Sequence, residues 1–270
     1  MFDALKTKNE IVEFIRDYYQ KNHLKGAVLG ISGGKDSGVV AGLMSEALGK
    51  ENVVGLTLPC HSKSKDAEDA KLVADKFGFE LINIDLTSTF DAFHTEIEKL
   101  GTYSEEELKN SDINLKPRLR MSTAYYMAAL LSAVKGGTYI VPGTSNACEL
   151  YVGYFTKGGD SVFDIAPIYS LTVEEVIKVG EVLGVPEKVL YKTPDDGLSG
   201  LSDEDKLGVK YKDIASVIRK DRQLDQEIFE KIEKLHRSSL HKFNIPKFEI
   251  KESCALVFIV VHLILYIMDM

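Results

Sequence analysis

The sequence is poor in the features that secreted, zinc-binding and nucleic-acid-binding proteins use. Only three cysteines occur in 270 residues, and Cys60, Cys148 and Cys254 match neither a zinc-binding nor a paired-disulfide spacing. We therefore expect free thiols in a reducing cytoplasm. Residues 1–20 carry scattered charges and no apolar core, so we expect no secretory signal there. Basic residues number 33 against 41 acidic ones, and a net charge of −8 disfavours binding to a nucleic-acid backbone.

What the sequence does contain, over its first half, is an alternation of strands and helices. An amphipathic helix is expected over residues 5–19, where apolar residues recur every three to four positions. The expected strands cover residues 27–31, 53–58, 81–85 and 138–141, and the expected helices cover 37–48, 64–77, 88–100 and 118–134. This order predicts an α/β fold with a doubly wound parallel sheet and helices on both faces. Ligands bind such sheets at the carboxyl ends of the strands.

The second half is predicted to form a helical C-terminal region. Thr172 and Glu175 have the spacing of a capping box, which opens a helix to residue 183. Residues 211–240 show helical periodicity. The acidic, glycine-rich segment 194–208 is expected to be a surface loop, either a lid or a solvated connector. No repeat or linker divides the chain, so we expect one domain over residues 1–250.

A glycine-rich break, Gly-Ile-Ser-Gly-Gly-Lys-Asp-Ser at residues 30–37, separates the first of these strands from the helix that follows. Consecutive glycines allow backbone conformations that aim several amide groups at one point, at the positive end of the helix dipole. Such a turn predicts an anion site. The Walker pattern does not match, because Asp36 follows Lys35 and Leu29 stands five residues before Gly34. A G-x-G-x-x-G dinucleotide pattern is also absent.

The run Ser-Gly-Gly-Lys-Asp-Ser resembles the pyrophosphatase loop, S-G-G-x-D-S, of ATP pyrophosphatases, which release AMP and pyrophosphate. The resemblance implies an adenine nucleotide alpha hydrolase-like fold, with the hydroxyl groups holding pyrophosphate and Asp36 offering a hard oxygen ligand to Mg2+. The implied ATP-binding residues of the loop are Gly30, Ile31, Ser32, Gly33, Gly34, Lys35, Asp36 and Ser37.

Three further blocks narrow the resemblance to one family. They are "NLKPRLRM" at 114–121, residues 141–168 from "VPGTSNACEL" to "FDIAPI", and "LHKFNIP" at 240–246. Together with the loop they are similar to ammonia-dependent NAD synthetases over roughly residues 5–246. The resemblance implies a ligase that adenylates the nicotinate carboxylate of deamido-NAD with ATP. Ammonia then amidates it, giving NAD, AMP and pyrophosphate.

The family resemblance also assigns roles outside the loop. Thr144 joins the ATP contacts, Glu149 shares a Mg2+ ion with Asp36, and the residues that contact deamido-NAD are Arg118, Lys157, Asp164, His241 and Lys242. Without the resemblance, Arg118 would be read as a surface charge. Asp164 is notable by itself, because a carboxylate between apolar neighbours needs a partner. It could bind ammonium and help to deprotonate it, which makes Asp36 and Asp164 the catalytic candidates.

The expected partners are ATP, deamido-NAD, ammonia and a second copy of the chain. The synthetase-like region fills the chain and leaves no room for a glutaminase unit, which favours free ammonia as the nitrogen source. The resemblance implies a homodimer, in which His241 and Lys242 serve either their own site or the neighbour's.

Two departures from the family keep alternatives open. Val173 stands where the family commonly has a lysine that contacts ATP, and Asp195 stands where it often has a hydroxyl residue. One alternative is another ligase with a pyrophosphatase loop, such as one acting on tRNA, which the net charge disfavours. The other is a nucleotide-binding regulatory protein without turnover, which the presence of Asp36 and Glu149 disfavours.

The C-terminal stretch, residues 251–270, does not fit the family. Its core, "CALVFIVVHLILYIM" at 254–268, is apolar except for His262. Fifteen residues are short for a membrane helix, which needs about 20, so membrane association is disfavoured. Burial against the body or a partner subunit and a tail foreign to the fold are the other two interpretations.

Overall fold

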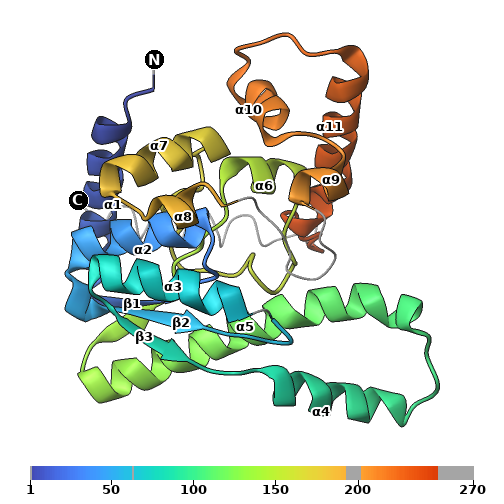
Figure 1. The fold of residues 1–270 in the computed structure, drawn as a ribbon, viewed down its shortest axis with the longest axis horizontal. Helices are drawn as coiled ribbons and strands as arrows, with labels where there is room; N and C mark the ends of the chain where they lie inside the picture. The colour runs from blue at the N-terminus through green and yellow to red at the C-terminus, as the bar shows by residue number, and fades with distance from the viewer. Residues whose placement is uncertain (1, 63, 193–201, 249–270) are drawn as a thin grey trace, which may run out of the picture.

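The structure is a computed structural model that describes residues 2–62, 64–192 and 202–248. Its centre is a parallel sheet of β1 (Leu24–Gly30), β2 (Val53–Thr57), β3 (Glu80–Asn83) and β4 (Thr138–Ile140), in the order β3-β2-β1-β4 (Figure 1). In register, Ala27 lies between Val53 and Ile140. The chain moves outward from β1 to β3 and then returns to the other side of β1. The switch point of the sheet therefore lies between β1 and β4, where ligands bind in doubly wound folds.

Helices cover both faces of this sheet, as predicted (Figure 1). One face carries α1 (Ala4–Lys21), α2 (Lys35–Leu48), α3 (Ser64–Phe77), α7 (Val173–Leu183) and α8 (Glu187–Leu190). The other face carries α4 (Thr87–Glu98) and α5 (Glu105–Lys135). Successive β1 residues alternate between the two cores, since Ala27 and Leu29 belong to the first and Val28 to the second. The doubly wound sheet and the opening amphipathic helix are confirmed.

A third group of helices forms the predicted helical C-terminal region. It contains α6 (Ala147–Val152), α9 (Asp203–Leu207), α10 (Tyr211–Arg219) and α11 (Gln226–Ser239), followed by a 3-10 turn at Leu240–Lys242. A separate core of buried residues, including Cys148, Ile214 and Ile232, holds α6, α10 and α11 together. Another 3-10 turn, Lys50–Asn52, precedes β2. Because α6 directly follows β4, this region is joined to the ligand edge of the sheet.

Three predicted boundaries are wrong. Helix α5 begins at Glu105 instead of residue 118, because Ser104 and Glu107 form a capping box and the helix continues through Pro117. The helix expected over 211–240 is two helices, since Lys220 adopts a left-handed φ of 55° and ends α10. The last part of the expected loop 194–208 is helix α9, which Ser202 caps; residues 193–201, with Asp195, lie outside the described residues.

The thiol prediction is confirmed for Cys60 and Cys148, which are buried and free. The apolar stretch 254–268, with Cys254, lies outside the described residues. Among the helices that the structure describes, none combines the length and the apolar character that crossing a membrane requires.

Candidate active site

The glycine break forms a tight turn between β1 and α2 that is braced by its own hydroxyl groups. The Ser37 hydroxyl accepts the amide of Ser32 at 3.2 Å and donates to the Gly34 carbonyl at 3.0 Å. The hydroxyls of Ser32 and Ser37 lie 3.1 Å apart. Ser37 is buried and Ser32 is exposed. The two hydroxyls predicted to hold pyrophosphate thus bond to each other in this conformation.

Gly33 gives the turn its shape. Its φ of +75° is a left-handed conformation that favours glycine, and a Cβ atom there would lie 2.7 Å from the carbonyl oxygen of Asp66. The next residue, Gly34, is the N-cap of α2 and brings no side chain to accept from the first helical amides. These amides lack acceptors inside the helix and carry the positive end of its dipole. The turn therefore offers a cradle of amide donors suited to an anion.

A second polar segment, directly after β4, meets this turn. Asn146 is fully buried and caps α6, and its Oδ1 atom accepts the amide of Glu149 at 3.1 Å. The Glu149 carboxylate in turn accepts the amide of Asn146 at 3.1 Å. The Nδ2 group of Asn146 donates to Oδ1 of Asp36 at 3.1 Å. The capping box of α6 thus places Glu149 near Asp36, at the switch point between β1 and β4.

Negative charge exceeds positive charge around Asp36 and Glu149. Burial and the nearby Asp36 raise the pKa of Glu149 well above its ordinary value. Lys35 is only 6% exposed, with its Nζ atom 3.3 Å from the Asp36 carboxylate and 6.0 Å from the Tyr211 ring centre. Burial alone lowers the pKa of Lys35, but Asp36 and Glu149 outweigh burial and raise it. Lys35 therefore pairs with Asp36 alone, while the charge of Glu149 also acts on it, an excess of negative charge that attracts a further cation.

The other three predicted ATP contacts, Gly30, Ile31 and Thr144, lie at the ends of the central strands. Ile31 is buried, and its amide donates to the carbonyl of Leu56 at 2.8 Å. Gly30 is the last residue of β1 and is exposed, and a Cβ atom there would meet no described atom within 4 Å. Open space therefore lies beside the end of β1. Thr144 is half-buried and follows Gly143, whose amide donates to the carbonyl of Ile165 at 2.8 Å. All three residues are at the carboxyl edge of the sheet.

The structure brings four predicted dinucleotide contacts together. The Arg118 guanidinium donates through Nε and Nη2 to the carbonyl of Lys157, each at 3.3 Å. Lys157 donates to the carbonyl of His241 at 3.1 Å. Lys242 donates to the carbonyls of Gly153 and Phe155 at 2.6 and 2.7 Å. This basic cluster joins α5, the loop after α6 and the final 3-10 turn.

Asp164 lies apart from the basic cluster, near the end of β4. Its carboxylate accepts the Tyr125 hydroxyl at 3.0 Å and the amide of Val141 at 2.8 Å. Tyr125 and Arg118 are two turns apart on the same face of α5, which is about 10 Å along the helix. Asp164 has the partners that an isolated carboxylate among apolar residues needs, and it remains exposed.

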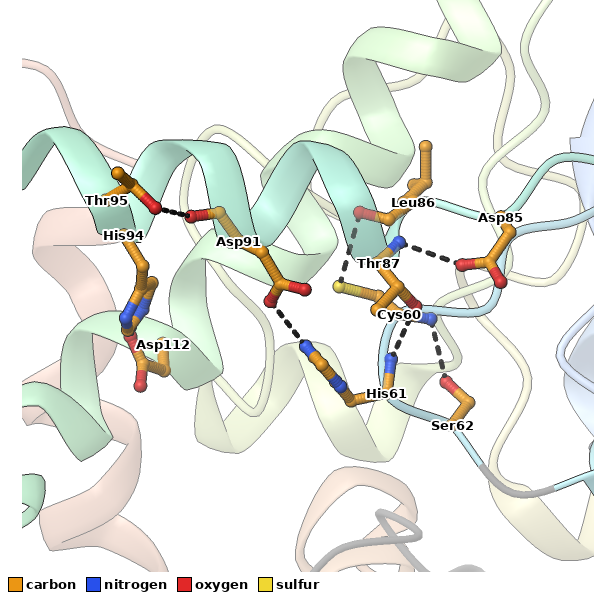
Figure 2. Close-up of polar contacts among 10 residues, drawn as sticks. All are labelled: Cys60, His61, Ser62, Asp85, Leu86, Thr87, Asp91, His94, Thr95 and Asp112. Atoms are coloured by element: carbon orange, nitrogen blue, oxygen red, sulfur yellow. Dashed lines mark hydrogen bonds and ion pairs between the residues drawn. The ribbon is translucent and has the colours of Figure 1, made fainter.

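The segment 61–69, which follows β2 at the carboxyl edge of the sheet, divides into two parts. Figure 2 shows His61 turned toward α4, with its Nε2 atom 2.7 Å from Oδ1 of Asp91. Nearby, Nε2 of His94 lies 2.6 Å from Oδ1 of Asp112 on α5. At the other end of the segment, Asp66 and Asp69 lie against Gly33. This second part contacts the glycine turn.

The sequence interpretation missed Asn146 and Tyr211. Asn146 could have been found, because Asn-x-x-Glu before a helix is the pattern of a capping box. Tyr211 is 5% exposed, and its hydroxyl has no hydrogen-bond partner in the described part of the chain. Burial and then the charges of Glu149, Asp203 and Asp36 raise its pKa, which places it beside the carboxylates. No local pattern around Tyr211 indicates this position.

Comparison with known proteins identifies the family. The NAD synthase family profile matches residues 7–246. The chain belongs to the NAD synthase family. The NH(3)-dependent NAD(+) synthetase of Alkaliphilus oremlandii is 40% identical over 248 residues, covering 89% of this chain and 95% of the relative. That of Carboxydothermus hydrogenoformans is 36% identical over 239 residues, covering 88% and 94%.

Solved structures agree with this membership of the NAD synthase family. The NMN synthetase of Francisella tularensis has a TM-score of 0.82 at 31% identity, covering 92% of this chain and 99% of that one. The NH3-dependent NAD synthetase of Campylobacter jejuni has a TM-score of 0.75 at 28% identity, covering 93% and 100%. The predicted family, fold class and ligase class are confirmed.

Proposed function

We propose that the protein joins ammonia to the nicotinate carboxylate of deamido-NAD and uses ATP to activate that carboxylate. A carboxylate oxygen attacks the α-phosphorus of ATP, the bond to the β-phosphate oxygen breaks, and pyrophosphate leaves. Ammonia then attacks the carbonyl carbon of the adenylate, AMP departs with one former carboxylate oxygen, and one proton is released. The observation that carries the proposal is the glycine turn at the switch point, with Asp36 and Glu149 beside it.

The turn suits the departing pyrophosphate. Negative charge accumulates on the leaving group, and amide donors fixed in advance stabilise that charge without rearranging. The amides at the start of α2 and the exposed Ser32 hydroxyl supply such donors. Lys35 adds a buried ammonium group next to Asp36. We assign the remaining ATP contacts to Gly30 and Thr144, at the ends of β1 and β4.

The residues present fit a Mg2+ ion. Magnesium prefers oxygen ligands and is often held by one or two carboxylates together with phosphate oxygens and water. Asp36 and Glu149 are two such carboxylates, and their repulsion is expressed in the raised pKa of Glu149. Within the described residues no group of three or more acidic, histidine or cysteine side chains could hold a metal, so phosphate and water would complete the shell. The bound ion would neutralise charge on the phosphates.

The basic cluster is the proposed site for deamido-NAD. Arg118 presents a planar fork that suits phosphate or carboxylate oxygens, and Lys157 and Lys242 add positive charge. The aromatic rings of Phe155 and Phe243 meet edge to face, with centres 5.1 Å apart, beneath Lys242. His241 belongs to the same turn. The role of Asp164 is to attract ammonium and help to remove its proton, since only uncharged ammonia attacks a carbonyl.

A second acceptor is supported by one comparison. The Francisella tularensis protein with a TM-score of 0.82 is named an NMN synthetase. Forming NMN by the amidation proposed here would start from nicotinate mononucleotide. That acceptor carries the same nicotinate carboxylate and lacks the AMP half. The basic cluster offers phosphate contacts to either acceptor. The NH(3)-dependent NAD(+) synthetases at 35–41% identity favour deamido-NAD as the first choice.

The deciding assay supplies MgATP and ammonium with either deamido-NAD or nicotinate mononucleotide. We expect NAD, AMP and pyrophosphate in equal amounts, a higher kcat/KM for deamido-NAD, and no product when glutamine replaces ammonium. A higher kcat/KM for the mononucleotide would assign the second acceptor. ATP binding without turnover of either acceptor would reject the proposal in favour of a regulatory protein.

We further propose a homodimer formed through the outer face of α5. Ala124, Ala128 and Leu131 are buried against the sheet. Tyr126, Leu130 and Val134 are 70%, 44% and 72% exposed and recur every four residues, which places them in one stripe. An exposed apolar stripe of this kind marks a surface that a partner covers. The family resemblance supplies the partner, a second copy of the chain.

A further inference from the structure

Asp69 is a fully buried carboxylate that no step above uses. It lies in α3 with no exposed surface, and two lysines form ion pairs with it. The Nζ atom of Lys188 lies 2.7 Å from its Oδ1, and the Nζ atom of Lys192 lies 2.7 Å from its Oδ2. Lys192 also reaches Oδ1 of Asp66, at 2.8 Å. A buried charge is retained only when it is paired in this way.

This ion-pair cluster, Asp66, Asp69, Lys188 and Lys192, lies directly beside the glycine turn. A Cβ atom at Gly33 would be 2.7 Å from the Asp66 carbonyl oxygen and 3.0 Å from the Asp69 Cβ atom. The start of α3 is therefore packed against the backbone of Gly33. Lys188 belongs to α8, and Lys192 follows it. The two lysines thus fix α3 to α8, which itself packs against α2, the helix that the turn begins.

The cluster has two consequences for an anion site. It holds the first turns of α3 so close to residue 33 that only glycine fits there. In this way it maintains the left-handed conformation of the turn, which directs the backbone amides toward the anion site. It also balances two carboxylates with two ammonium groups. Without the lysines, an unpaired carboxylate next to the turn would repel phosphate.

We propose that Asp69, through Lys188 and Lys192, is a positioning residue for the phosphate-binding turn. The proposal rests on the proposed function only in that the turn binds the phosphates of ATP. The proposal does not require any contact between the cluster and the acceptor. Loss of the cluster is therefore expected to weaken ATP binding selectively, because the basic cluster that we assign to deamido-NAD is built from other elements.

The test compares Asp69→Asn and Lys192→Met with Lys8→Met. Lys8 is a matched control, since it is a buried lysine paired with Glu46, on the last turn of α2, far along the helix from the glycine turn. For each protein we would measure the dissociation constant of MgATP by calorimetry, the KM values of ATP and deamido-NAD, and the melting temperature. Calorimetry reports on the turn even if the acceptor differs from the one proposed.

We expect Lys192→Met to raise the dissociation constant and KM of ATP about tenfold or more, with the KM of deamido-NAD nearly unchanged. Asp69→Asn should raise both ATP values by a smaller factor, because the turn loses its support while the two freed ammonium groups still attract phosphate. Lys8→Met should lower the melting temperature and leave both KM values unchanged. Lys192→Arg should restore part of the ATP affinity, because it keeps the positive charge. If Asp69→Asn does not fold, the ATP affinity of Lys192→Met alone tests the proposal.

Two results would overturn the proposal. One is a lower melting temperature with unchanged ATP affinity, as in the control, which would make the cluster purely structural. The other is an equal loss of affinity for ATP and for deamido-NAD. A wild-type protein that binds MgATP but forms no amide would instead reject the proposed function, and the calorimetric comparison would still test Asp69.

Discussion

Asp36 and Glu149 are the side chains on which the proposed chemistry depends, and each is placed by a short local pattern. Asp36 is fixed by the turn after β1 and by the bond from Asn146. Glu149 is fixed by the capping box at the start of α6. Burial and the charge of Asp36 raise the pKa of Glu149, and a cation bound between the two carboxylates would offset their repulsion.

Replacing Asp36 by Asn should reduce Mg2+-dependent pyrophosphate release by about 100-fold or more, because a charged oxygen ligand is lost. The amide oxygen of the new side chain can still accept the bond from Asn146, so we expect the melting temperature to be unchanged or slightly higher. A pyrophosphate-release assay and thermal denaturation measure the two effects. Asp75→Asn, which alters an exposed ion pair with Lys71 on α3, is the control. Full activity of Asp36→Asn would remove the metal assignment.

Replacing Arg118 by Ala should raise the KM of deamido-NAD about tenfold and leave the KM of ATP unchanged, since a charge-assisted bond to the acceptor is lost. Steady-state kinetics with each substrate varied in turn gives both values. Arg16→Ala is the matched control, because Arg16 likewise donates through Nε and Nη2 to backbone carbonyls, those of Ala47 and Glu46, away from the site. Equal effects of the two substitutions would contradict the assignment of Arg118.

A contact between α7 and α10 joins the helical C-terminal region to the helices that cover the sheet. Arg219, at the end of α10, pairs with Glu175 in the first turn of α7 and donates to the Ser170 carbonyl at 2.7 Å. Burial alone raises the pKa of Glu175, but the bonds from Arg219 and from the Thr172 amide outweigh burial and lower it. The pair therefore stabilises the contact only while Glu175 is charged.

Replacing Glu175 by Gln should lower the free energy of unfolding by about 1 kcal/mol at pH 7, a modest value because Arg219 is partly exposed. The folded-state pKa of Glu175 is depressed, so its contribution is complete above the unfolded value of about 4.3 and is lost as pH falls through the folded value. The difference between variant and wild type should therefore shrink below about pH 4. Denaturant unfolding at several pH values tests this, with the exposed Glu174→Gln as control. A pH-independent difference would contradict it.

Local patterns predicted the elements, and long-range contacts determined what the patterns could not show. The strands around Val28 and Val54 and the turn at Gly33 follow from periodicity and glycine spacing. The start of α5 was missed because Pro117 is tolerated inside a long helix that Ser104 caps. The bond between Lys157 and the His241 carbonyl joins residues 84 positions apart, and no local signal encodes it. Lys157 and His241 were predicted from the family resemblance instead.

Over the molecule as a whole, the proposed dimer depends on the outer stripe of α5. Introducing Glu at Leu130 and Val134 together should convert the dimer to a monomer, because two buried charges would face the partner chain. Light scattering after size-exclusion chromatography measures the mass of each form. Tyr169→Glu, at an exposed residue away from α5, is the control and should remain dimeric. A wild-type protein that is monomeric at all concentrations would contradict the proposed dimer.

The transfer of oxygen tests the proposed chemistry most directly. Deamido-NAD labelled with 18O in its nicotinate carboxylate would be converted with MgATP and ammonium, and the AMP and pyrophosphate would be analysed by mass spectrometry. Adenylation predicts one labelled oxygen in AMP and none in pyrophosphate, since AMP leaves with an oxygen of the former carboxylate. Label in inorganic phosphate, with ADP as the other product, would show attack at the γ-phosphate and contradict the assignment of the glycine turn to pyrophosphate.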